Sequence, residues 1–462
     1  MDKQKKRYKL KKKKRQVNYV PALIALVLIL CVSIGVVVLA VSHSKKNKSD
    51  IASSNNASGN TTEMTTVPET TTSEPEVEIN VCMIGDMLIH EGVYKTGLES
   101  DGSYNFDHLF ANILPDLAAS DMNIVNQETI LGGTEMGLGG YPAFNSPQEI
   151  GDAEVKAGFN IILHATNHTL DRGLSGVNNT IEFWKTKHPD TTYLGIHDSE
   201  EDAKNIYVYE KQGFKVAVLN YTYGTNGIAI PSSAPYCVDT FDDEAKVRDD
   251  IRRAHKLADM VIVCPHWGTE YVYESTSYQD QWTNVFLEEG VDVVLGTHPH
   301  VIEPVKEFTR ESDGHKMVVY YSLGNFVSNQ DEIPRMIGGM AKLTLYKKGD
   351  NASIKSYEFE PVVTHKRYGY KVTIEEYGLV PLVIHYNDDF TEMGVYKLSD
   401  YTPELASQNK ILSDPTCCYT GYFGCICGAT LFDYPTHGPR NFSVDYCKQF
   451  CKAVLGDIYK DE

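Results

Sequence analysis

Two histidines separated by one residue, His298 and His300, lie in a Gly-Thr-His-Pro-His segment at residues 296–300. The apolar run 291–295 precedes this segment and predicts a buried strand. A tight turn at the end of a rigid strand would let both imidazoles face one cavity, and imidazole nitrogen is a common metal ligand. The segment therefore predicts a metal-binding site, provided that other strands end in residues of the same kind.

Several other apolar runs are followed by residues that can bind metals. They are Asp86 and His90 after 77–84, Asn126 and Glu128 after 122–125, Asn167, His168 and Asp171 after 161–163, His266 after 260–263, and Asn325 after 319–323. In open α/β folds, ligands bind beyond the carboxyl ends of strands, so these residues predict one shared pocket. Carboxylate oxygen combined with imidazole nitrogen suits Mn, Fe or Zn better than Ca or Mg.

Each of these residues also has an ordinary structural explanation. Asp86 could be a turn residue, Glu128 a solvated loop acid, and His266 a hydrogen-bonded core histidine. Their common position at strand ends is what favours a single site.

Strand-like and helix-like segments alternate from Val77 onward. Further apolar runs lie at 216–219 and 318–321, and helical patterns cover 242–257 and 276–289. This alternation predicts an α/β fold with buried sheets.

Charge is distributed unevenly along the chain. Residues 1–15 hold ten Lys or Arg and one acid, whereas the whole 462-residue chain has a net charge of −19. An acidic body argues against nucleic acid as a partner.

Residues 20–42 are apolar and long enough to cross about 30 Å of hydrocarbon. Because Lys and Arg stay on the cytoplasmic side, we expect a single-pass cell-membrane protein with a cytoplasmic N-terminus and an extracellular body. A cleaved signal peptide is the alternative, but the run is long for one and lacks a good cleavage site.

The sequence predicts six segments. They are a basic head at 1–19, the membrane anchor at 20–42, a flexible Ser/Thr-rich linker at 43–76, the main domain at 77–350, a β-rich extension at 351–412, and a Cys-rich tail at 413–462. The tail contains Cys417, Cys418, Cys425, Cys427, Cys447 and Cys451. Outside the cytoplasm these cysteines favour disulfides, and a zinc knuckle that includes His437 is the alternative.

Six motifs in fixed order carry a resemblance to a known family. They are Ile-Gly-Asp-Met-Leu at 84–88, Asn-Gln-Glu at 126–128, Ala-Thr-Asn-His-Thr-Leu-Asp-Arg-Gly at 165–173, His-Trp-Gly-Thr-Glu-Tyr at 266–271, Gly-Thr-His-Pro-His-Val at 296–301, and Tyr-Ser-Leu-Gly-Asn-Phe at 321–326. Residues 77–345 resemble the CapA family of capsule-synthesis proteins, also described as poly-γ-glutamate synthesis proteins that are metallophosphatase-like. The resemblance implies a calcineurin-like metallophosphoesterase fold, with two β-sheets packed between helices.

The resemblance also implies roles for the residues of the site. Glu128 would bridge two divalent metal ions. Asp86 and His300, with His90, would bind one ion, and Asn167, His266 and His298 would bind the other. His168 would donate a proton or hydrogen bond and be oriented by Asp171, while Arg172 and Asn325 would contact the substrate. Four positions depart from the common pattern: His90 stands where many members have Arg, Gln127 where Leu is usual, Thr166 where Asn is usual, and Glu303 where Gln is frequent. Glu303 predicts an altered charge preference toward substrate.

Three functions fit this sequence. The first is a membrane-anchored factor for the synthesis or export of poly-γ-glutamate or a related capsule polymer, acting beside membrane-bound polymer synthase subunits. The second is an extracytoplasmic metal-dependent hydrolase of a phosphoester or of the polymer. The third is a non-catalytic module that binds the polymer, and the retained set of metal ligands counts against it.

Overall fold

The computed structural model describes residues 75–330, 332–368, 372–375, 383–386, 390–409 and 442–461. The predicted basic head and membrane anchor lie outside the described residues, as do His437 and the four cysteines between 417 and 427. Among the residues described, no helix combines the length and apolar character needed to cross a bilayer.

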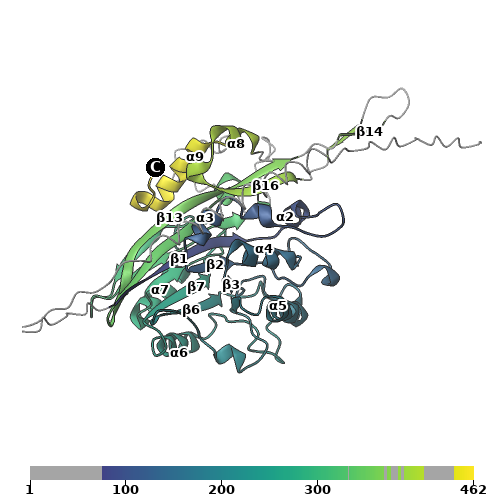
Figure 1. Ribbon diagram of the computed structural model, residues 1–462. Helices are drawn as coiled ribbons and strands as arrows, with labels where there is room; N and C mark the ends of the chain where they lie inside the picture. Colours follow the sequence, from purple (N-terminus) through teal and green to yellow (C-terminus); the bar gives the residue numbers. More distant parts are fainter. Residues whose placement is uncertain are drawn as a thin grey trace, which may run out of the picture. The chain divides into compact units, whose positions relative to one another are not determined.

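Two β-sheets form the centre of the molecule (Figure 1). The first has eight strands in the order β16-β13-β12-β1-β2-β3-β4, with β11 beside β1, and the second has six in the order β5-β6-β7-β8-β10-β9. The strands of the first sheet are β1 (Glu76–Met87), β2 (Met122–Asn126), β3 (Ile161–Leu163), β4 (Thr192–Leu194), β11 (Asn325–Val327), β12 (Ile337–Lys348), β13 (Asn351–Tyr368) and β16 (Phe390–Lys397). Those of the second are β5 (Tyr207–Lys211), β6 (Phe214–Thr222), β7 (Met260–His266), β8 (Val293–Leu295), β9 (Val305–Thr309) and β10 (Lys316–Tyr320), and β14 (Val372–Glu375) pairs with β15 (Val383–Tyr386).

Alternation along the strands explains the layers. Val81 and Met83 of β1 pack in the same apolar cluster as Val216 and Val218 of β6, so the two sheets meet face to face. The intervening residues point the other way, because successive side chains of a strand lie on opposite faces. Those of β1 pack beneath one group of helices and those of β6 beneath another. The predicted α/β fold with two sheets between helices is confirmed.

Helices cover both outer faces of the sandwich (Figure 1). Those that pack on the first sheet are α2 (Glu91–Thr96), α3 (Leu114–Ala118), α4 (Glu149–Ala157) and α5 (Gly173–Lys187). On the second sheet lie α6 (Glu244–Ala254) and α7 (Ser277–Glu289), close to the predicted helical ranges. Helix α7 begins with a capping box between Thr276 and Gln279, which satisfies backbone donors at its first turn.

The sheet topology brings the carboxyl ends of several strands to one edge. Strands β1, β2 and β3 are parallel neighbours in the first sheet, and β7 and β8 are parallel neighbours in the second. The residues that follow these strands are those singled out by the sequence. The shared edge is therefore where a site would be assembled.

A glycine fixes the end of β1. A Cβ on Gly85 would lie 1.9 Å from the carbonyl oxygen of Gly324, which directly precedes β11. The backbone there comes so close that there is no room for a side chain at residue 85. We expect Gly85→Ala to lower the free energy of unfolding by about 3 kcal/mol. Urea unfolding of metal-free protein measures this, with Gly224→Ala as the control, because a Cβ there would meet nothing within 4 Å. Equal effects of the two substitutions would contradict the packing argument.

The C-terminal segments belong to the same core. Strands β13 and β16 extend the first sheet beyond β12. Helix α8 (Pro403–Gln408) contacts β13, and α9 (Val444–Leu455) contributes Cys447, Phe450 and Cys451 to the cluster between the sheets. Both cysteines are buried and are free thiols in the structure. Their predicted partners in the tail are not among the described residues, so the disulfides stay a prediction.

A buried ion-pair network lies beside β6, away from the strand-end residues. His197 contacts Asp239 through Nε2 at 2.7 Å and Asp202 through Nδ1 at 3.4 Å. Burial alone would lower the pKa of His197, but the two carboxylates outweigh it and raise the pKa to about 9.

This network predicts a pH dependence of stability. Since the folded pKa of His197 exceeds its unfolded value, the stabilisation is complete below about pH 6.5 and is lost as pH rises through about 9. We expect His197→Gln to lower the free energy of unfolding by roughly 3 kcal/mol at pH 6 and by much less at pH 9.5. Urea unfolding at both pH values checks this, and a difference that does not shrink with pH would refute it.

Candidate metal centre

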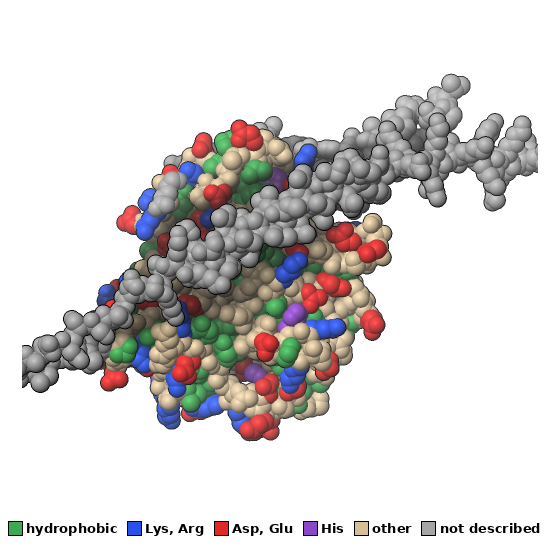
Figure 2. Space-filling model, in the orientation of Figure 1, with side chains coloured by type: hydrophobic (Ala, Val, Ile, Leu, Met, Phe, Trp, Pro, Cys, Tyr) green, Lys and Arg blue, Asp and Glu red, His purple; other side chains and the backbone are tan. Residues whose placement is uncertain are grey.

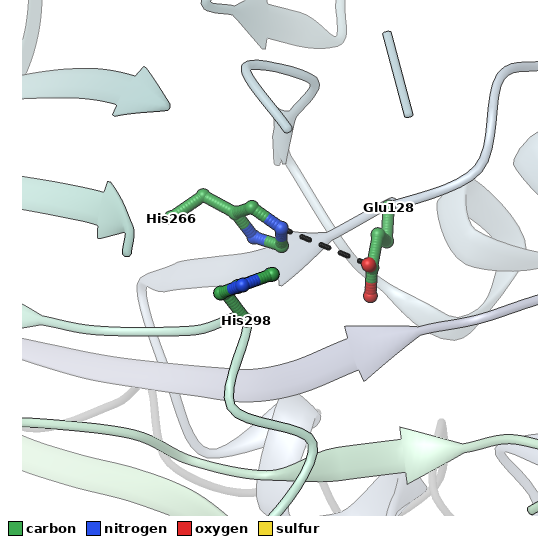
Figure 3. Close-up of side chains that lie close together, drawn as sticks. All are labelled: Glu128, His266 and His298. Atoms are coloured by element: carbon green, nitrogen blue, oxygen red, sulfur yellow. Dashed lines mark ion pairs between the residues drawn. The ribbon is translucent and has the colours of Figure 1, made fainter. Parts of the chain in front are cut away.

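Two groups of buried side chains at the shared sheet edge could each hold a metal ion. One group contains Asp86, Glu128 and His300, and the other contains Glu128, His266 and His298. Within each group, the candidate ligand atoms lie within 4.8 Å of one another. Figure 3 shows the second group, in which the two imidazoles approach the Glu128 carboxylate from separate strand ends. Glu128 is common to both groups, while His90 and Asn167, which the resemblance also implied as ligands, belong to neither of them.

The environment of Glu128 is the strongest indication that the site binds cations. Its side chain is fully buried, and neither carboxylate oxygen has a hydrogen-bond partner. Its Oε1 atom lies 3.7 Å from Nε2 of His266 and 3.7 Å from Nε2 of His300. Burial raises the pKa of Glu128 well above its ordinary value. Because a buried carboxylate without hydrogen-bond donors is costly, this position fits a carboxylate that bridges two cations.

His266 and His298 are suited to bind a metal as neutral ligands. Burial lowers the pKa of both well below 6.5, and their positions near other imidazoles add to this effect. His266 contacts Oδ1 of Asn167 through Nε2 at 2.8 Å and Oγ1 of Thr297 through Nδ1 at 3.1 Å. Nδ1 of His298 is buried and has no hydrogen-bond partner. The side chains of Asn167, His266 and His298 thus offer donors on one side of Glu128.

His300 lies on the other side of Glu128, between two oxygen acceptors. Its Nδ1 atom is 3.2 Å from Oδ2 of Asp86 and 3.0 Å from Oδ1 of Asn325. Burial opposes protonation, but Glu128 and Asp86 outweigh it and raise the pKa of His300 to about 9. A metal ion bound here would take the place of that proton.

The turn that carries the two histidines is held in an unusual conformation. The φ angles are +100° at His298 and +59° at His300, a region that residues other than glycine rarely adopt. Such conformations cost about 1–3 kcal/mol each and persist where the surroundings enforce them. The backbone N–H of His298 donates to the Asp86 carboxylate at 3.3 Å, which ties the turn to the end of β1.

Next to the two groups lies a histidine–carboxylate pair. Nδ1 of His168 is 2.7 Å from Oδ2 of Asp171, and the same oxygen accepts from the backbone N–H of Phe144. The Phe144 ring packs edge-on against His168 at 4.7 Å. With Nδ1–H donating to Asp171, Nε2 of His168 is available for proton exchange with a bound molecule. This is the arrangement expected of a proton donor that is oriented by Asp171.

Three of the predicted roles change in the structure. His90 joins neither ligand group, because its Nδ1 lies 3.2 Å from the Leu88 carbonyl oxygen and its ring packs on Phe144 at 5.1 Å. Asn325 is fully buried and its amide donates to carbonyl and amide oxygens, so it positions His300 and does not face a substrate. Glu303 is buried against Gln279, at 2.6 Å, and therefore cannot set a preference for substrate charge by contact.

Arg172 remains a candidate for contact with substrate. It is partly exposed, follows Asp171 directly, and has a buried Nε atom without a hydrogen-bond partner. Its guanidinium lies beside Gly139, where an added Cβ would meet it at 2.2 Å.

Sequence reasoning gave no role to two side chains that support the site. The amide of Asn126 donates to Oδ1 of Asp86 at 2.9 Å and so orients that carboxylate. Its place at the end of β2 was the available signal. Phe144 packs against both His90 and His168, and nothing in its local sequence pattern indicates this position.

Comparison with known proteins identifies the family of this chain. The family described as "Bacterial capsule synthesis protein PGA_cap" matches residues 80–330, which is more than half of the chain. The capsule biosynthesis protein CapA of Bacillus anthracis is 28% identical over 55% of this chain and 60% of its own length. The PGA biosynthesis protein CapA of Bacillus subtilis is 30% identical over 45% of this chain and 52% of its own length. The chain thus spans between half and two thirds of these relatives.

Solved structures with detectable similarity include two hydrolases. The NAD nucleotidase of Haemophilus influenzae matches with a TM-score of 0.38 and 14% identity, over 63% of this chain and 58% of that chain. The calcineurin-like phosphoesterase YfkN of Bacillus subtilis matches with a TM-score of 0.34 and 14% identity, over 62% of this chain and 91% of that chain. On the strength of the family match across residues 80–330, this chain belongs to the bacterial capsule synthesis family PGA_cap.

Proposed function

We propose that this chain is a metal-dependent hydrolase with a metallophosphoesterase-like centre, which serves capsule polymer synthesis or export. The observation that carries the proposal is Glu128, whose two unpartnered oxygens face a histidine and carboxylate group on one side and a pair of histidines on the other. By analogy with the PGA biosynthesis relative, the polymer is poly-γ-glutamate or a similar anionic polymer. Membrane anchoring through residues 20–42 and action beside polymer synthase subunits are parts of this proposal.

Each residue of the centre has a distinct task. Asp86, Glu128 and His300 would hold one divalent ion, and Glu128, Asn167, His266 and His298 the other. Such ions supply a Lewis acid for the scissile group and an acidified water as nucleophile. Asn126 and Asn325 keep Asp86 and His300 in place. His168, held by Asp171, would pass a proton to the leaving oxygen.

Two substrate classes fit the centre, a phosphoester and the γ-linked peptide bond of the polymer. The phosphoester is favoured because the paired ligand groups match the need to stabilise both attacking and leaving oxygens. The polymer itself is the second candidate, since the relatives are named for capsule and PGA biosynthesis.

A direct experiment separates hydrolysis from simple binding. Full-length protein is loaded with Mn²⁺, Fe²⁺ or Zn²⁺ and assayed against phosphomonoesters, phosphodiesters and γ-linked glutamate oligomers. We expect turnover that chelators abolish and that one of these metals restores. Absence of metal after loading would refute the metal centre. Bound metal without turnover of any substrate would instead leave the polymer-binding function.

A further inference from the structure

A positively charged group lies beside the metal centre, in a part of the chain beyond the family match at residue 330. Arg335 belongs to a short 3₁₀ helix, Ile333–Met336, that leads into β12. The Cζ atom of its guanidinium lies over the ring of Tyr271, 3.6 Å from the ring centre. This geometry is a close cation–π contact, which restricts the position of the guanidinium group.

Tyr271 connects this arginine to the metal centre. Its backbone N–H donates to the carbonyl oxygen of Pro299, between the two ligand histidines, at 2.8 Å. Its ring centre lies 6.0 Å from that of His300. Tyr271 also has a φ of +65°, so the surroundings hold it in a conformation that a tyrosine rarely adopts. The stacked pair is therefore a neighbour of His300 in a fixed position.

Hydrogen bonds fasten the pair to the residue that positions His300. The carbonyl oxygen of Arg335 accepts from the Asn325 amide at 2.9 Å. Gln330 accepts from the same amide at 3.0 Å and donates to the Tyr271 hydroxyl at 3.1 Å. The buried Lys366 of β13 donates to the Gln330 carbonyl oxygen. This network links Arg335 and Lys366 to His300 through Asn325 and Gln330.

The guanidinium group of Arg335 has N–H donors that could bind an anion. Among the described residues, Arg335 forms an ion pair with Glu332, at 3.0 Å, and the Glu332 side chain is 57% exposed. An exposed pair of this kind contributes little and is easily exchanged for another partner. The Nε atom of Arg335 is buried without a hydrogen-bond partner, and the side chain as a whole is 23% exposed, so part of the guanidinium group reaches solvent. On the face shown in Figure 2, acidic and basic side chains of the described residues are interspersed.

We infer that Arg335, held over the ring of Tyr271, is the anion-binding residue of a substrate subsite beside His300. It takes a carboxylate or phosphate of the molecule whose scissile bond lies at the metal centre. This inference deepens the proposed function and rests on it. A guanidinium fork pairs with either anion through two parallel hydrogen bonds, which gives orientation as well as affinity.

The test measures binding separately from turnover. Metal-free full-length protein is titrated by calorimetry with inorganic phosphate and with γ-linked triglutamate, and the same triglutamate with all of its carboxyl groups converted to amides is the comparison without a carboxylate. We expect Arg335→Gln to weaken binding of phosphate or triglutamate by about tenfold to a hundredfold, with no change for the amide form. Loss of phosphate binding alone assigns a phosphate of the substrate, and loss of triglutamate binding alone assigns polymer carboxylates.

The matched control is Arg252→Gln, which removes an exposed arginine on α6 that pairs with Glu289. Wild-type binding by Arg335→Gln, or equal weakening in both variants, would overturn the inference. If Arg335→Gln does not fold, Arg335→Lys replaces it, because it keeps the charge without the planar fork, and unchanged binding in that variant would likewise overturn the subsite. For a protein that turns over, Arg335→Gln raises KM more than it lowers kcat and leaves metal content unchanged. If no substrate is hydrolysed, the proposed function fails while the binding result still decides the subsite.

Discussion

Glu128→Gln is expected to remove most bound metal from the protein and to lower hydrolysis on the order of 10³-fold or more. The amide keeps the shape of the side chain but lacks the charge that two cations would share. Because Glu128 belongs to both ligand groups, one substitution weakens both positions, with a loss in metal affinity of at least about 100-fold. Metal content after dialysis, measured by mass spectrometry, and steady-state hydrolysis of a phosphodiester check this result.

Glu154→Gln is the matched control for that experiment. Glu154 lies in α4, is fully buried, and has two oxygens without hydrogen-bond partners, as Glu128 has. Burial raises its pKa well above the ordinary value, so an amide resembles its protonated form. We expect the control to keep its metal and activity. Retention of two ions by Glu128→Gln, or their loss from Glu154→Gln, would show that Glu128 does not bridge a metal pair.

His168→Ala is expected to lower kcat by about 10²–10⁴-fold while metal content stays at the wild-type level. His168 belongs to neither ligand group, and its contact with Asp171 orients it toward proton transfer. The loss should be largest for substrates with poor leaving groups, because these need a proton on the departing oxygen. Comparison of an alkyl phosphoester with a nitrophenyl phosphoester measures the difference.

His188→Ala is the control. His188 lies at the C-terminal end of α5 and makes a similar contact with Asp152, at 2.6 Å. We expect it to leave kcat unchanged. Equal losses on both phosphoesters in His168→Ala would exclude the role as proton donor, and a loss of metal would make His168 a ligand or a support of one.

The strand-end residues could be predicted from the sequence because local patterns determine them. Short apolar runs predicted β1, β2, β3, β7 and β8, and parallel strands bring their carboxyl ends together whatever the details of packing. The division of the ligands into two groups came from the resemblance to a family, and the structure brings together Asp86, Glu128 and His300 in one group and Glu128, His266 and His298 in the other.

The remaining features depend on contacts between distant residues. His90 follows β1 as a ligand would, but its ring packs on Phe144 from a loop more than fifty residues later. Asn325 had the residue type of a substrate contact, and only its burial beneath the 3₁₀ helix before β12 shows that it positions His300. The Arg335–Tyr271 stack joins segments without any repeating pattern, so no periodicity could have revealed it.

The position of β1 has a consequence for how the chain acquires its fold. This first described strand lies inside the first sheet, with β2 on one side and β12 on the other, and its antiparallel register pairs Glu76 with Lys348. Closure of that pairing requires a loop of more than 250 residues, and contacts of such separation form slowly. During synthesis, β1 and its apolar face must therefore wait for most of the polypeptide to follow. The interval in which β1 has an unpaired edge is when the nascent chain is most exposed to aggregation, and it is the stage at which assistance from chaperones would matter most.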